Sequence, residues 1–314
     1  MEQRYTLLIK IAFAVVLVVL VVQVYRAATL PVGSGEAYLY DRFVRPSTGQ
    51  VLASELPDRD VLYSLLEKRS VGLFHVSPFS VRLPGFLFGV LYLVAVWRIA
   101  GSMLGSGWRF LAVVAAAAAL PLRWDWFVRA EGTGAALALL VCAAWLAVER
   151  RYLNLIGICL GLSLTAQIGF AIPAMALALS ILALRRSWWE WIDRVAIPAV
   201  AVVVILLAVP ASHARAPAEN PPELTAGQAS QLQSALDALR DDAGTKPIRI
   251  ATFPAAEPIV NFYRAQHRAN NWERVLRENV AGHFDYYLIP AADSARAGEL
   301  VYGDAYFVVV RAPL

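Results

Sequence analysis

The sequence predicts an α-helical multi-pass membrane protein with about seven spans and a small C-terminal extracytoplasmic α/β domain. Of the 314 residues, 59% are hydrophobic and only 17% are charged, whereas a soluble globular chain carries about a quarter charged residues. The apolar residues also gather in runs long enough to cross a bilayer, which takes about 20 residues and at least roughly 17. This composition excludes an ordinary soluble enzyme, and it also excludes a disordered or collagen-like chain.

Seven apolar segments are predicted to cross the membrane. The first, Leu7–Thr29, is too long for a secretory signal and lacks a small-residue cleavage site, so we interpret it as an uncleaved anchor. The run Tyr152–Leu184 would be roughly 50 Å long as one helix. Because Gln167 interrupts this run, it is predicted to form two short helices. The remaining spans are Leu83–Ala100, Phe110–Leu122, Gly132–Val148 and Val195–Ala211.

Basic residues beside the spans predict the orientation of the chain, because short cytoplasmic loops are enriched in Lys and Arg. Three short loops, 98–109, 149–151 and 185–194, carry most of the flanking arginines. Short loops on the other side carry only Arg123 and Arg129. We therefore expect a cytoplasmic N-terminus and a periplasmic C-terminal domain, in a bacterial inner membrane.

Composition divides the chain into a transmembrane domain (1–211, with a long outer loop at 30–82), a Pro- and Ala-rich linker (212–227) and a C-terminal α/β domain (228–314). Residues 1–211 hold 18 Lys and Arg against 12 Asp and Glu, whereas the remaining residues hold 10 against 12. The basic excess therefore lies in the membrane part, where it reports topology and lipid headgroups. Membrane lipids are expected partners, and nucleic acid is not.

The C-terminal domain shows strands alternating with helices, which is the pattern of a βαβ unit. Helical periodicity covers Ala229–Asp242 and Ala256–Gln266. No Gly-rich phosphate loop follows the first predicted strand, so a nucleotide site is not expected. The predicted strands are Ile248–Phe253, Tyr286–Ile289 and Ala305–Arg311.

Candidate catalytic residues lie in the long outer loop. Glu36 and Asp60 are carboxylates that could act as general base for an acceptor hydroxyl, or hold a metal near a phosphate leaving group. A short amphipathic helix is expected over Val61–Arg69, lying along the membrane surface. The alternative is that the loop acids are solvated charges paired with neighbouring arginines: Glu36, Asp41, Asp58 and Asp60 with Arg42, Arg45 and Arg59.

Candidate ligand-binding residues lie at the ends of the predicted spans. Arg82, Arg123 and Arg129 could bind a lipid phosphate, because the guanidinium group matches phosphate geometry in a bidentate manner. Trp124 and Trp126 could stack on a sugar or a prenyl chain. The alternative is an interfacial aromatic belt accompanied by arginines whose charged heads reach the membrane surface.

Three segments resemble the GT-C superfamily of integral-membrane glycosyltransferases. They are Glu36-Ala-Tyr38, the helix Val61–Leu66, and Phe79-Ser-Val-Arg82-Leu83-Pro84 at the start of the second span. The resemblance covers roughly residues 5–190, and it is closest to bacterial relatives of protein O-mannosyltransferases and to the lipid A aminoarabinose transferase. It implies a polyprenyl-phosphate sugar as donor and chemistry at the outer face. It also implies a carboxylate in the first outer loop that acts as base or faces a metal.

Several positions depart from the pattern of this family. Gly35-Glu36 stands where relatives typically have Asp-Glu, and Arg59-Asp60 where they often have Asn-His. Ala130–Thr133 replaces a segment that resembles Ala-Arg-Gly-Tyr, Gln167 replaces an expected Asn, and active relatives usually have more than seven spans. These departures favour a catalytically degenerate glycosyltransferase relative. Such a protein would serve as an accessory or structural subunit of a membrane complex, with a protein partner and possible binding of polyprenyl phosphate.

Two other functions stay open. An active glycosyltransferase would move a sugar from a polyprenyl-phosphate donor to an outer-face acceptor, with Glu36 or Asp60 as base. A transporter or channel is the weaker alternative, because the predicted spans hold few charged residues, Lys10 among them near a span end. No metal site is expected, since the four histidines are dispersed and Cys142 and Cys159 lie inside apolar runs.

Overall fold

A computed structural model describes residues 2–45, 61–149, 152–185, 192–207, 224–275, 283–293 and 298–312. The chain is mostly helical and has a small mixed sheet near its C-terminus. It divides into two compact units. The first consists of Met1–Thr29, Ser47–Leu73 and Phe79–Ala216, and the second of Leu30–Pro46, Phe74–Pro78 and Pro217–Leu314.

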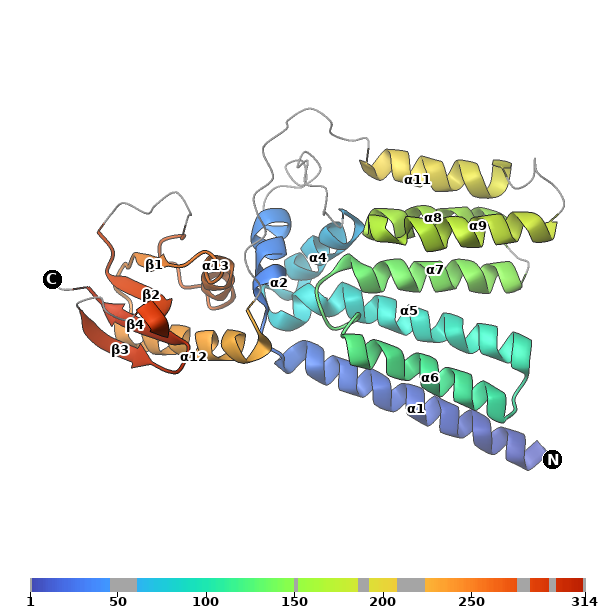
Figure 1. Cartoon of the computed structure of the whole chain (residues 1–314), viewed down its shortest axis with the longest axis horizontal. Helices are drawn as coiled ribbons and strands as arrows, with labels where there is room; N and C mark the ends of the chain where they lie inside the picture. Colours follow the sequence, from blue (N-terminus) through green and yellow to red (C-terminus); the bar gives the residue numbers. More distant parts are fainter. Residues whose placement is uncertain are drawn as a thin grey trace. The chain divides into compact units, whose positions relative to one another are not determined.

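The first unit is built from helices whose axes run roughly side by side (Figure 1). Helices lie at all seven segments that the sequence predicts as spans. The predicted break near Gln167 is present, because α8 ends at Ala166 and Gln167 has an extended backbone (φ −159°, ψ 120°). The helices are α1 (Glu2–Thr29), α4 (Val61–Phe74), α5 (Pro78–Leu104), α6 (Trp108–Trp124), α7 (Gly132–Val148), α8 (Leu153–Ala166), η2 (Ile168–Phe170), α9 (Ala171–Arg185), η3 (Ile192–Ala196) and α11 (Ile197–Leu207).

Two helices are long and apolar enough to cross a membrane, Thr6–Thr29 within α1 and Pro78–Leu104, which is α5. The surface of α1 is strongly apolar, with Phe13, Val18 and Val21 each at least 60% exposed. Exposed apolar surface of this extent is unfavourable in water. The two helices therefore suggest association with a membrane. Shorter apolar helical stretches follow at Trp108–Leu120, Gly132–Val148, Leu153–Ala166 and Ala171–Ala183.

Two glycines bring α8 into close contact with η3 and α11. A Cβ atom at Gly161 would lie 2.6 Å from the backbone oxygen of Ala199, and one at Gly157 would overlap the backbone oxygen of Val195. The glycines are four residues apart, so they lie on one face of α8. Small residues at this spacing are typical of helix pairs that pack closely inside membranes.

The second unit contains a four-stranded mixed sheet with strand order β1-β2-β4-β3. β1 (Ile250–Thr252) runs parallel to β2 (Tyr286–Pro290), and α13 (Glu257–Gln266) lies between them in sequence, which confirms the predicted βαβ pattern. β4 (Phe307–Arg311) pairs antiparallel with β2 and with β3 (Glu299–Gly303). β3 is absent from the sequence prediction, because its residues are exposed or half-buried and show no apolar alternation. The remaining elements are α12 (Ala226–Ala243), where helix was predicted, and η4 (Ala291–Asp293).

The segment that follows α1 belongs to this second unit. It forms α2 (Ser34–Leu39) and a π-helical turn, η1 (Tyr40–Val44). The ring of Tyr40 packs edge-on against Phe262 of α13, with centroids 5.2 Å apart. The backbone N–H of Leu224 donates to the Ser34 hydroxyl (3.2 Å). Residues 30–45 are thus held by the C-terminal part of the chain.

Candidate functional site

The Glu36 carboxylate stabilises the start of α2. Its Oε2 accepts a hydrogen bond from the backbone N–H of Gly33 at 3.0 Å, and the residue is only 7% exposed. A Glu at the third helical position that reaches back to the N-cap N–H is a known capping arrangement. Glu36 therefore has a structural contact at the place where the sequence predicts a general base.

Several of the other candidates lie outside the described residues. Asp60 is one of them, and so are the side chains of Arg123 and Trp124 at the end of α6. In the loop after α6, Trp126 is half-buried. Arg129 is exposed, and its Nη1 lies 3.8 Å from the Glu131 carboxylate.

Arg82 is buried inside the first unit. It lies within α5, which begins at Pro78 rather than at the predicted start of the span, Leu83. The side chain is 3% exposed, and Nη1 donates to the backbone oxygen of Ala27 in α1 (3.2 Å). A buried guanidinium must place its donors on acceptors. This contact joins the end of α1 to the first turns of α5.

The face that α4 buries is polar. Tyr63, Ser64, Glu67 and Ser70 are at most 6% exposed, whereas Leu73 is 75% exposed. Glu67 lies four positions after Tyr63 and three after Ser64, and Ser70 lies three positions after Glu67, so they share one face of the helix. The outward side carries Leu66 and Leu73 together with Arg69. A polar inward face beside exposed leucines differs from the usual helix on a soluble protein, whose apolar stripe faces the core. The predicted helix is present, but its polar face is the one that packs against the protein.

This polar face contacts the start of α5. The Tyr63 hydroxyl donates to the backbone oxygen of Val81 (3.1 Å), and the Ser70 hydroxyl donates to that of Ser80 (2.5 Å). Both acceptors lie in the same helical turn as Arg82. Glu67 lies on α4 between the two donors, and it is 1% exposed. We refer to Tyr63, Ser64, Glu67, Ser70, Ser80 and Arg82 as the α4–α5 polar cluster.

The loop after α6 also reaches this region. A Cβ atom at Gly85 would lie 3.2 Å from the Tyr63 hydroxyl and equally close to the backbone oxygen of Phe127. It would lie 3.4 Å from the backbone oxygen of Arg129. The structure thus brings the backbone of the predicted binding loop to α5, one turn from Arg82. Sequence reasoning missed Glu67, although its helical spacing from Tyr63 and Ser70 was the available signal.

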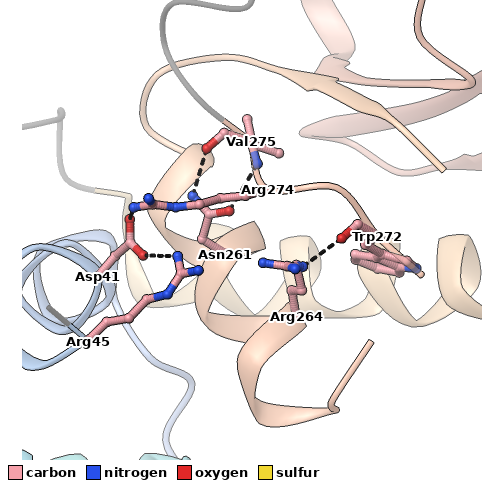
Figure 2. Close-up of polar contacts among 7 residues, drawn as sticks. All are labelled: Asp41, Arg45, Asn261, Arg264, Trp272, Arg274 and Val275. Carbon is pink, nitrogen blue, oxygen red and sulfur yellow. Dashed lines mark hydrogen bonds and ion pairs between the residues drawn. The ribbon is translucent and has the colours of Figure 1, made fainter. Parts of the chain in front are cut away.

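A second charged site lies in the second unit (Figure 2). The Asp41 carboxylate lies between two arginines: Arg45 Nη1 is 3.0 Å from Oδ1, and Arg274 Nη2 is 2.5 Å from Oδ2. The pairing of Asp41 with Arg45 is one of the ion pairs that the sequence suggested. Arg264, on α13, adds a third guanidinium, and its Nε donates to the backbone oxygen of Trp272 (2.6 Å). We call Arg45, Arg264 and Arg274 the arginine cluster.

The surroundings of Arg264 in the arginine cluster disfavour the charged form of its guanidinium. Burial lowers the pKa of its guanidinium, and repulsion from Arg45 and Arg274 lowers that pKa further, while Asp41 opposes the shift. The cluster joins residues that are more than 200 positions apart in the chain. Spacing in the sequence alone therefore gave no signal for it.

Another polar network attaches α12 to the sheet. The Tyr286 hydroxyl donates to Asp242 (2.7 Å), Arg311 also contacts Asp242, and Arg311 Nη1 lies 2.7 Å from Glu299. Hydrogen bonds from Arg311 and Tyr286 lower the pKa of the Asp242 carboxyl. This network is structural, since it connects the end of α12 to three neighbouring strands, β2, β4 and β3.

Among the described residues, no group of three or more His, Cys, Asp or Glu side chains could hold a metal ion. Comparison of the chain with protein-family models, with curated proteins and with solved structures finds no match.

Proposed function

We propose that this chain is a catalytically degenerate, glycosyltransferase-like membrane protein that serves as an accessory or structural subunit of a membrane complex. In this proposal the seven apolar helices cross a bacterial inner membrane, the N-terminus is cytoplasmic, and residues 212–314 lie in the periplasm. The sequence resemblance to the GT-C superfamily supplies the fold relationship. The departures at Gly35 and Asp60 supply the expectation of weak or absent catalysis.

The environment of Glu36 is the observation that carries the proposal. A general base must present a carboxylate oxygen within hydrogen-bond reach of the substrate proton. Here Oε2 already accepts the Gly33 N–H at 3.0 Å, as the cap of α2. The chain therefore uses this carboxylate to hold α2 in place.

Three features support insertion into a membrane. The exposed surface of α1 is apolar. The helix α4 turns its polar face inward and leaves Leu73 outward, as expected when the surroundings are lipid. The α8 contact uses Gly157 and Gly161, a spacing common between membrane helices.

Purification of the full-length protein from its native membrane in mild detergent tests this function. We expect a protein partner in a fixed ratio, and no sugar transfer from any polyprenyl-phosphate sugar offered with the membrane extract as acceptor. Robust transfer by the purified wild-type protein would overturn the proposal, and Glu36→Gln then shows whether Glu36 is the base.

One observation favours the alternative, an active glycosyltransferase. Glu67 is a buried carboxylate in the α4–α5 polar cluster, on the face that packs against the turn holding Arg82. An acid and an arginine on facing helices are groups that a transferase could use as base and phosphate ligand. If transfer is found, Glu67→Gln should abolish it while Glu36→Gln should not. If Glu36→Gln abolishes transfer and Glu67→Gln does not, Glu36 is the general base.

A further inference from the structure

The arginine cluster carries more positive charge than its own acid neutralises. Among the described residues, the cluster brings three guanidinium groups together with one carboxylate, Asp41, which leaves an excess of two positive charges. Arg45 and Arg274 both contact Asp41, whereas Arg264 does not. Within the described part of the chain, no hydrogen bond or ion pair involves the two terminal nitrogens of Arg264. Its Nε donates to the backbone oxygen of Trp272.

Hydrogen bonds hold the residues of the cluster on α13 and on the segment that follows it. The Nε contact with the Trp272 oxygen fixes the plane of the Arg264 guanidinium. Asn261 lies one turn earlier on α13. Its Oδ1 accepts a hydrogen bond from the backbone N–H of Val275 (3.1 Å), and its Nδ2 donates to the backbone oxygen of Val275 (3.0 Å). This anchors the segment that carries Arg274. In Figure 2 a terminal nitrogen of Arg264 is directed toward Arg45. Donors that are already ordered lose little entropy when a ligand binds.

We propose that Arg45, Arg264 and Arg274 form a binding site for a phosphate monoester. A guanidinium presents parallel N–H donors that match two phosphate oxygens. A phosphate monoester carries about −1.5 to −2 charges at neutral pH, which balances the excess of two. A phosphodiester carries a single negative charge and would leave half of that excess uncompensated. The chemistry therefore predicts preference for a monoester.

Two sources could supply such a group, a lipid headgroup or a soluble phosphate compound. Asp41 follows the end of α1 by twelve residues, which keeps the site close in sequence to the longest apolar helix. The site itself does not depend on the proposed accessory function. A lipid as the source of the phosphate does depend on insertion of α1 into a membrane. The lipid and the soluble phosphate are therefore tested with separate probes.

Binding is measured with the full-length protein in detergent, by calorimetry, against three probes. Inorganic phosphate tests the anion alone, dihexanoyl phosphatidic acid tests a lipid monoester, and dihexanoyl phosphatidylglycerol tests a lipid diester. We expect phosphatidic acid to bind at least about tenfold more tightly than phosphatidylglycerol. Phosphate and phosphatidic acid binding equally well would assign a soluble ligand to the same site. No binding of either, or a preference for the diester, overturns the proposal.

Substitutions locate the binding. Arg264→Gln removes the guanidinium whose terminal nitrogens have no described partner, and should weaken binding about 10- to 100-fold, as expected for a charge-assisted hydrogen bond. Arg45→Gln, at a more exposed position, should weaken it as well and serves if Arg264→Gln does not fold. Arg240→Gln is the matched control, because Arg240 has nearly the exposure of Arg45, 39% against 40%, and pairs with acids of its own helix. Equal weakening by the control, or none by Arg264→Gln, contradicts the site.

Discussion

Glu36 can be tested with a pair of substitutions, because Gln and Ala differ in whether they keep the contact with Gly33. Gln can accept the same N–H in a capping arrangement, so Glu36→Gln should leave stability close to that of the wild type. Glu36→Ala should lower the free energy of unfolding by about 0.3–1.5 kcal/mol, the range for a helix cap. Denaturant unfolding of the full-length protein measures both. Equal losses in the two variants would mean that the negative charge, rather than the capping contact, is what matters.

Gln23 offers a second test at the scale of one side chain. It lies in α1 and is 1% exposed, and neither its amide oxygen nor its amide nitrogen has a hydrogen-bond partner among the described residues. A buried polar group without a partner costs about 1–3 kcal/mol. Gln23→Leu has a similar volume and removes that cost, so the thermal unfolding midpoint should rise. Gln23→Ala should lower it by leaving a cavity. A lower unfolding midpoint for Gln23→Leu would show that the Gln23 amide makes a stabilising contact in the folded protein.

At the scale of helix packing, glycine-to-alanine substitutions test the close contact between α8 and α11, because the change in stability should be a loss at the contact and a small gain elsewhere. Gly161→Ala should destabilise the protein by about 1–3 kcal/mol, because its Cβ would lie 2.6 Å from the backbone oxygen of Ala199. Gly169→Ala is the control, since a Cβ there meets no atom within 4 Å. Replacing glycine where space is free usually stabilises slightly. Thermal unfolding in detergent compares the two, and the same sign for both would contradict the packing.

The attachment of α12 to the sheet should make stability depend on pH. Hydrogen bonds from Arg311 and Tyr286 lower the pKa of Asp242 in the folded protein, so this stabilisation is present above the unfolded pKa of about 3.9. It is lost as the pH falls through the lowered, folded pKa. Calorimetric midpoints at a series of acidic pH values should therefore depend less on pH in Asp242→Asn. Asp241→Asn, at a side chain 75% exposed, should keep the wild-type dependence.

At the scale of the whole molecule, the proposed seven-span topology gives a clear expectation for reporter fusions. A reporter fused after Arg186 should lie in the cytoplasm, and one fused after Leu314 should lie outside it. The reason is the bias of flanking arginines toward the loops at 98–109, 149–151 and 185–194. Enzymatic reporters that are active in only one compartment measure this directly. The same compartment for both fusions would rule out seven spans.

Much of the architecture could be predicted from the sequence, because it follows from local patterns. Apolar runs predicted the positions of the helices, and the length of the run 152–184 predicted the break at Gln167. The alternation of strands with helices in the C-terminal domain predicted three of the four strands. The orientation of α4 could not be read in this way, since its helical period does not say which face is buried. The arginine cluster could not be predicted from the sequence either. Its members meet only because α2 and η1 pack on α13, and no short-range signal encodes that contact.

The assignment of residues 30–45 to the second unit sets an order of events during synthesis. One of the two arginines that pair with Asp41 is Arg274, which the ribosome adds 233 positions later. At about 5–20 residues per second, roughly 10 to 50 s pass before that partner exists. During this interval Tyr40 and Asp41 lack the surface that will cover them, while the helices that follow are already being made. The first segment to leave α1 is therefore among the last to find its native contacts, so a nascent chain stalled before residue 224 should leave it accessible to proteases.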